Sequence, residues 1–137
     1  MPYQLTFAKL HEYDAGKSGI SIEVILQAGL QNQRLTAKLD SGSSFCIFQQ
    51  EYGEALGLDI ESGQPQWIGS PMGEFLTYGH GVTLSALGFD FDIVAYFTAA
   101  PNFTRNVLGR HGWLQKVRMG VVDYDGKLYV SDYNDPL

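Results

Sequence analysis

Alternating apolar and polar positions dominate the hydrophobic pattern of this chain and predict β-strands. The clearest alternation runs from Ile20 to Leu26, where every second residue is apolar and the residues between are largely polar. A shorter alternation from Leu35 to Leu39 leads directly into Asp40. Both patterns have the period of two expected when one face of a strand is buried.

Most of the remaining chain also favours extended structure. Turns are expected at residues 14–19 and 29–33, and strands or hairpins at residues 3–11 (with a bulge), 45–48, 66–78, 82–86, 89–97, 119–124 and 127–131. The pair Asp125-Gly126 predicts a tight turn between the last two strands. Short helices are expected over 49–56, ended by Gly57, and from 106 to 114. The predicted fold class is therefore all-β with one or two short helices.

Length and composition limit the organisation of the chain and the classes of partner. At 137 residues, with 45% apolar residues, the sequence fits a single folded domain over 1–137. The net charge of -6 argues against nucleic acid and against an anionic membrane, because both require clustered lysine and arginine. Cys46 is the only cysteine, and no apolar leader or membrane-spanning run is visible, so a cytoplasmic location is expected.

The most suggestive chemistry follows the second alternating strand. Asp40-Ser41-Gly42-Ser43 reads as a tight polar loop that presents a carboxylate at the end of an apolar strand. Gly42 is available for backbone angles that a side chain would forbid. Taken alone, this motif is far more typical of an ordinary turn than of a functional site.

Two further motifs change that interpretation. The glycine-containing hairpin tip at residues 68–75 and the segment 106–110 (Asn-Val-Leu-Gly-Arg) follow the Asp-Ser-Gly loop in order. Together the three motifs resemble the retropepsin-like aspartic proteases, the single-domain relatives of pepsin found in retroviruses and some bacteria. The resemblance covers roughly residues 20–114, leaving an N-terminal strand extension and a C-terminal hairpin outside it.

The resemblance implies a half-barrel that assembles as a two-fold homodimer. In this family two Asp-[Ser/Thr]-Gly loops meet, and their aspartates share one proton and activate the water that attacks a peptide bond. This chain has one such loop, so an active aspartic endopeptidase needs Asp40 from each of two copies. The expected substrate is an extended peptide with hydrophobic residues around the scissile bond, and no cofactor is implied.

The resemblance also gives each loop residue an expected role. Ser41 is expected to hydrogen-bond to the partner's loop and Gly42 to permit a tight turn. The hydroxyl of Ser43 is expected to donate to the catalytic carboxylate and to favour its ionised form, which predicts an acidic optimum. Leu108 and Gly109 are expected to pack beneath the loop.

A flap that closes over the peptide is implied for the hairpin between Trp67 and Tyr78. Pro71 and Glu74 depart from the glycine-rich tip of the retroviral enzymes, which raises the question of how the flap closes. Ordinary hairpin packing explains Trp67 and Phe75 as well as pocket lining does. The residues assigned to substrate binding are Trp67, Ile68, Gly69, Ser70, Pro71, Met72, Gly73 and Phe75.

Two features depart from the family pattern. Arg110 corresponds to an arginine that pairs with an acid just after the catalytic motif in retroviral enzymes, but Ser44 and Phe45 stand in that region here. The chain also has additional residues at both ends, where retroviral subunits interleave terminal strands. The terminal strands are still the expected interface.

Other interpretations of the sequence are weaker or remain open. The histidines lack zinc-like spacing, so no metal site is expected, and Cys46 is expected to be buried packing. Ser41 has no histidine placed to activate it as a nucleophile. Two alternatives to the protease stay open: a catalytically idle retropepsin fold used for dimerisation or peptide binding, and a small β-barrel that binds an apolar ligand.

Overall fold

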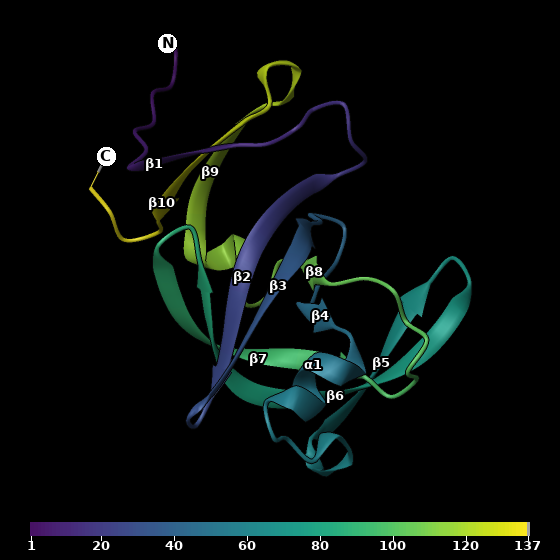
Figure 1. The fold of residues 1–137 in the computed structure, drawn as a ribbon. Coiled ribbons are helices and arrows are strands. Elements are labelled where there is room, and N and C mark those ends of the chain that lie inside the picture. The colour runs from purple at the N-terminus through teal and green to yellow at the C-terminus, as the bar shows by residue number, and fades with distance from the viewer. Residues whose placement is uncertain (137) are drawn as a thin grey trace.

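A computed structural model describes residues 1–136 and shows two β-sheets with one α-helix (Figure 1). The strands are β1 (Lys9–Glu12), β2 (Ile20–Ala28), β3 (Gln31–Leu39), β4 (Ile47–Phe48), β5 (Gln64–Ser70), β6 (Gly73–Ala86), β7 (Phe89–Thr98), β8 (Val107–Leu108), β9 (Val117–Val122) and β10 (Lys127–Asp132). The helix is α1 (Gln50–Ala55), and 3-10 turns occur at η1 (Ile60–Ser62), η2 (Leu114–Lys116) and η3 (Asp123–Asp125). The predicted all-β class is confirmed.

The larger sheet closes on itself. Its strand order is β2-β3-β8-β4-β7-β6-β5, and β2 also pairs with β6 from Val24↔Ala86 to Gln27↔Thr83. The strands β2, β3, β8, β4, β7 and β6 therefore form a closed ring within one chain, where a half-barrel was expected. Strand β5 stays outside this ring and pairs only with the first half of β6.

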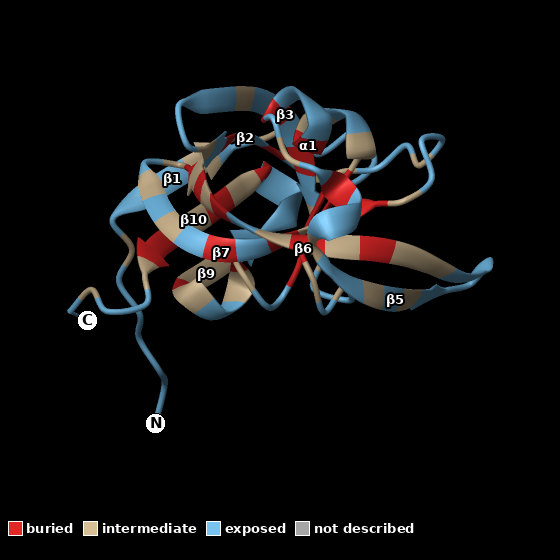
Figure 2. Cartoon of the chain, turned by 90° about the horizontal axis from the view of Figure 1, so that it is seen from below, coloured by how far each residue is buried: buried red, intermediate tan, exposed pale blue. Residues whose placement is uncertain are grey.

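Strand β6 is longer than the sequence suggests. The predicted hairpin at 66–78 and strand at 82–86 are joined by one continuous strand through Gly79 and Gly81. Neither glycine has a positive φ angle, so both are extended and neither breaks the strand. Because β6 continues past the barrel, the hairpin β5–β6 projects from the body on the side away from the termini (Figures 1 and 2).

The core lies inside the ring, where the alternating side chains predicted for β2 and β3 point inward. Ile22 and Leu26 are fully buried, as is Ala37 on the neighbouring strand. Figure 2 shows such alternation on β7, where buried bands are separated by exposed or intermediate ones. The helix α1 lies within the range predicted for it, and Gly57, at φ 81°, stands just past its end as expected.

The N-terminal strand is shorter than predicted. Residues 3–11 were expected to be extended and paired, but pairing begins at Lys9, opposite Val130. The backbone N–H of Ala8 donates to the hydroxyl of Ser131 (2.6 Å), and the guanidinium of Arg118 donates to the carbonyl of Thr6 (2.8 Å). Side chains therefore hold this segment where a strand ladder was predicted.

The helix predicted from residue 106 to 114 is wrong. Val107 and Leu108 form β8, and the backbone N–H groups of Arg110 and His111 donate to the carbonyls of Ser43 (2.8 Å) and Ser44 (2.9 Å). These donors bind a distant loop, so they cannot form the i to i−4 bonds of a helix. Only the 3-10 turn η2 remains.

Two turns also differ in detail from their predictions. The turn expected at 29–33 is confined to Gly29-Leu30, and β3 begins at Gln31. The tight turn expected at Asp125-Gly126 is wider, because Asp123–Asp125 form a 3-10 turn before Gly126, whose φ is 64°.

The terminal strands form the smaller sheet, in the order β1-β10-β9. Its register runs from Lys9↔Val130 to Glu12↔Lys127 between the first and last strands. The strands expected to interleave with a second copy are thus paired within one chain. Over residues 1–136, no helix has both the length and the apolar character needed to cross a membrane.

Candidate active site

The Asp-Ser-Gly loop begins where β3 leaves the barrel. Strand β3 pairs in parallel with β8, with Leu39 opposite Leu108. The next residue, Asp40, continues this contact, since its N–H donates to the carbonyl of Leu108 (3.0 Å). Its carboxylate Oδ1 accepts from the N–H of Gly42 (2.9 Å) and its carbonyl accepts from the N–H of Ser43 (3.1 Å). The half-buried Asp40 is therefore fixed by backbone on both sides of the residue.

Gly109 fits the floor of this loop so closely that no side chain could replace its hydrogen. A Cβ atom there would lie 2.1 Å from the carbonyl oxygen of Phe45 and 2.8 Å from that of Ser43. Both contacts are with backbone, which cannot rotate away. The loop and the segment after β8 are thus interlocked by close packing and by the bond from Arg110 N–H to the carbonyl of Ser43.

The expected role of one loop residue, Ser43, is wrong in this structure. The hydroxyl of Ser43 donates to the carbonyl of Phe45 (2.7 Å), not to the carboxylate of Asp40. The argument for an acidic optimum from that hydroxyl therefore has no support. Gly42 lies in the expected tight turn, which the bond from Ser43 N–H to the Asp40 carbonyl closes, but without a left-handed backbone. A Cβ at this position would lie 3.1 Å from Asp40 Oδ1. Its small size lets its N–H approach the carboxylate.

Ser41 and Arg110 both lie on the surface. Ser41 is exposed, so the predicted bond to a partner's loop concerns a hydroxyl that a second copy can reach. Within residues 1–136 the only ion pair joins Arg34 and Glu23 (3.8 Å), so Arg110 has no acidic partner in the part of the chain that the structure describes. The mismatch noted in the sequence persists in the fold.

The hairpin β5–β6 has a well-defined tip. Ser70 pairs with Gly73 across Pro71 and Met72, and Gly73 has a φ of 108°. The Ser70 hydroxyl donates to the carbonyl of Gly73 (2.7 Å) and accepts from the N–H of Met72 (3.2 Å). Pro71 is thus accommodated in a hydrogen-bonded turn, with Met72 almost fully exposed at its apex.

A cleft of about 1080 Å³ separates this hairpin from the Asp40 loop. All the substrate-binding residues expected from the sequence line it, together with Asp40, Gly42 and Ser43. Three predicted site residues do not line it: Ser41 is exposed outside the lining, and Leu108 and Gly109 lie buried beneath the loop. The structure therefore brings the β5–β6 hairpin and the Asp40 loop to one cavity.

The third wall of the cleft was not predicted from the sequence. It is formed by the segment between β7 and β8, where Phe103 packs against Phe75 with ring centroids 5.1 Å apart. Asn106 anchors the segment, because its side chain accepts from the N–H of Gln49 (3.0 Å) and donates to that residue's side chain (3.0 Å). Residues 99–105 show no regular alternation of apolar and polar residues, so the sequence gives no signal that this segment lines the cleft. The additional lining residues are Ser44, Phe45, Ile47, Glu74, Leu76, Thr98, Ala100, Asn102, Phe103, Thr104, Arg105 and Val107.

Cys46 is fully buried behind the loop, as expected for a packing residue. Burial raises the pKa of its thiol to about 11, while the hydrogen bond from the N–H of Gly109 (3.4 Å) lowers it in part. Residues 1–136 contain no group of three or more His, Cys, Asp or Glu side chains that could hold a metal ion.

Because the Cys46 thiol titrates higher in the folded chain than in the unfolded chain, stability should fall at alkaline pH. The unfolded thiol ionises near pH 9 and the folded one near 11, so the loss develops between these values and reaches about 2–3 kcal/mol. Urea unfolding at pH 8 and pH 10.5 measures it. Cys46→Ala should unfold with a smaller difference between the two pH values, and an equal difference would contradict the assignment.

The site in one chain is thus a single Asp-Ser-Gly carboxylate, held by β8, facing a cleft under a projecting hairpin. The cleft contains one other acid, Glu74, next to the hairpin tip. No family model matches the chain, and a search of curated proteins found no match to it either. Function is therefore inferred from the residues and their arrangement alone.

Proposed function

We propose that the protein is an aspartic endopeptidase whose active form is a homodimer with one Asp40 from each chain. The observation that carries the proposal is the placement of Asp40: its loop is fixed by β8 at the floor of a cleft that a two-stranded hairpin covers. A carboxylate held by backbone beside a cleft of about 1080 Å³ suits hydrolysis of an extended chain.

The chemistry requires a second carboxyl group at hydrogen-bonding distance. With two carboxyls so close, one keeps a proton while the other is ionised. The ionised group takes a proton from water as the water attacks the peptide carbonyl, and the protonated group donates to the carbonyl oxygen. A two-fold axis beside the loop supplies the second Asp40, since the chain contains no second Asp-Ser-Gly motif.

Apolar groups on the hairpin favour hydrophobic side chains in the substrate. Trp67 is 59% exposed and Met72 is 96% exposed, although both are large apolar residues that line the cleft. A bound peptide would cover them, and the edge strand β5 offers unpaired backbone groups to an extended chain. Closure of the hairpin over the peptide would exclude water from the reacting groups.

A catalytically idle dimerisation or peptide-binding module is the second candidate. It is favoured by the intrachain pairing of β1 with β10, which removes the interleaved strands expected at the interface, and by the absence of an acidic partner for Arg110 among residues 1–136. Both features would weaken the dimer on which catalysis depends, so they favour an idle peptide-binding module over a dimerisation module. The cytoplasmic location remains a prediction from the single cysteine.

Concentration dependence separates the two candidates. Cleavage of an unfolded protein, measured per chain, should rise with chain concentration over the range in which sedimentation shows dimers forming. Dimers without cleavage would support the idle module. Cleavage per chain that stays constant while sedimentation finds only monomers would contradict a shared catalytic centre.

A further inference from the structure

A second, smaller pocket adjoins Asp40 and is lined by no residue of the β5–β6 hairpin. Its volume is about 310 Å³, and Asp40, Thr104, Arg105 and Val107 line both this pocket and the main cleft. Its charged residues are two cations, Lys38 and Arg105, and the carboxylate of Asp40 itself.

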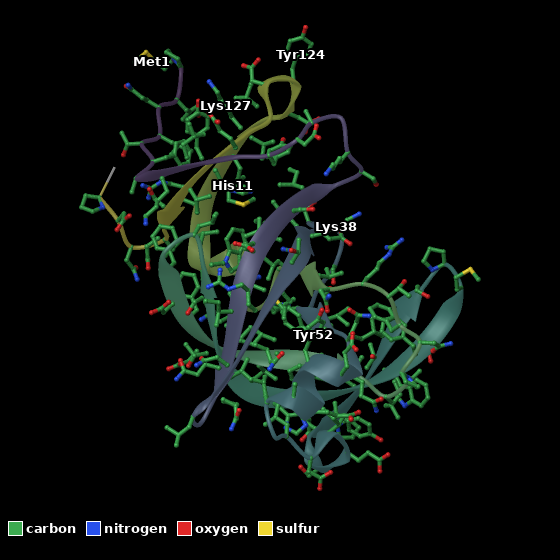
Figure 3. All side chains as sticks on the ribbon, viewed as in Figure 1. Met1, His11, Lys38, Tyr52, Tyr124 and Lys127 are labelled. Carbon is green, nitrogen blue, oxygen red and sulfur yellow. The ribbon has the colours of Figure 1, made fainter. Side chains whose placement is uncertain are left out.

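Adjacent strands bring the two cations together. Lys38 lies on β3 opposite Val107, and its N–H donates to the carbonyl of Asn106 (2.8 Å), the residue after Arg105. Gly19 leaves room for the lysine stem, because a Cβ there would lie 3.0 Å from Lys38 Cδ. Figure 3 shows Lys38 near the middle of the molecule, far from Lys127 on the terminal sheet.

Both cations are available to a ligand. The only ion pair within residues 1–136, between Arg34 and Glu23, involves neither of them. The other polar side chains around them belong mainly to serines and threonines, whose hydroxyls can donate to an anion. In a chain with a net charge of -6, two cations at the edge of the cleft form a local site for negative charge.

We propose that Lys38 and Arg105 form a subsite that selects an aspartate or glutamate side chain of the peptide substrate. This inference rests on the proposed function and specifies its substrate. Lys38 and Asp40 are two positions apart and face the same side of the extended chain, about 7 Å apart along it. For a peptide that lies extended along the direction from Lys38 to Asp40, at about 3.3 Å per residue, this spacing puts the acidic side chain about two residues from the scissile bond.

Matched peptides test the subsite. Peptides that differ only by Glu or Gln, two residues to either side of the scissile bond, are compared by kcat/KM at low salt. At one of these positions kcat/KM should be about fivefold higher for the Glu peptide than for the Gln peptide. This is the effect expected of two solvent-exposed ion pairs, one with Lys38 and one with Arg105. The preference should fade in about 0.5 M NaCl, because salt screens exposed charges.

Charge reversal sharpens the test. Lys38→Glu combined with Arg105→Glu should reverse the preference between the two peptides, whereas Lys127→Glu, a matched reversal on β10, should leave the ratio unchanged. The same ratio is measured without catalysis, as peptide binding to the Asp40→Asn chain by fluorescence anisotropy. A binding ratio near one in that chain overturns the subsite, whatever the cleavage assay shows.

The outcomes separate the subsite from the protease. Equal cleavage of both peptides, still dependent on Asp40, overturns the subsite and leaves the endopeptidase standing. Absence of Asp40-dependent cleavage of any peptide overturns the proposed function. A phosphoserine peptide bound more than about tenfold tighter than the Glu peptide would assign the pocket to phosphate and overturn selection of a carboxylate.

Discussion

Asp40→Asn should lower kcat/KM for peptide cleavage by about 10³-fold or more. The amide has nearly the same shape as the carboxylate, and its oxygen can still accept the N–H of Gly42, which lies 2.9 Å from Oδ1. It cannot take or release a proton in the relevant pH range, so the paired chemistry is lost while the loop is kept. Cleavage of an unfolded protein and of a fluorogenic peptide, with circular dichroism as a check on folding, measures the effect.

Two acids serve as controls for Asp40. Asp125→Asn, in the 3-10 turn of the terminal hairpin, should retain full cleavage. Glu74→Gln removes the other acid of the cleft and should lower kcat/KM less than about tenfold, because in the proposed dimer the second catalytic carboxyl comes from the partner's loop. A loss in Glu74→Gln as deep as that in Asp40→Asn would instead place both acids in one chain.

Gly109→Ala should destabilise the fold by about 3 kcal/mol or more, or prevent folding. The added methyl would meet the carbonyl oxygen of Phe45 at 2.1 Å, and relief requires the backbone of the loop to move. Because that backbone positions Asp40, cleavage should fall even in the fraction that folds. Urea unfolding followed by tryptophan fluorescence measures the loss, since the buried Trp113 lies just beyond Gly109 in the chain.

Gly81→Ala is the matched control. Gly81 lies within β6 and does not have a positive φ, and a methyl group added there would meet no atom within 4 Å. Its substitution should change the free energy of unfolding by no more than about 1 kcal/mol. Equal destabilisation by the two substitutions would show that the close contact between Gly109 and the loop is not what stabilises this region.

The alternation of apolar and polar residues correctly predicted the strands that have one buried face and one exposed face. The alternation from Ile20 to Leu26 survives in β2 because one face packs inside the barrel and the other meets water. The sequence pattern gave wrong predictions where contacts with residues far away in the sequence determine the conformation. The segment after Asn106 looks helical, but its N–H groups are used by the Asp40 loop, and the glycines of β6 look like breaks although they are extended.

The site was predictable to the extent that its parts lie on short contiguous motifs. The Asp40 loop and the hairpin tip were placed from sequence, and both line the same cleft. Phe103 and Arg105 were not, because they lie in an aperiodic segment that only the side chain of Asn106 and the neighbouring strands hold in place. The predicted bond from the Ser43 hydroxyl to the Asp40 carboxylate is wrong because the hydroxyl bonds locally instead, to the carbonyl of Phe45 two residues away.

Mixing of subunits tests the shared catalytic centre most directly. Wild-type and Asp40→Asn chains are combined in equal amounts, allowed to exchange, and assayed at a fixed total concentration at which the chains are dimeric. If each centre needs Asp40 from both chains, only dimers of two wild-type chains cleave, and activity should fall to about one quarter of that of the wild type. Activity that falls only to about one half would mean that each chain acts alone, and would contradict a centre shared between two copies.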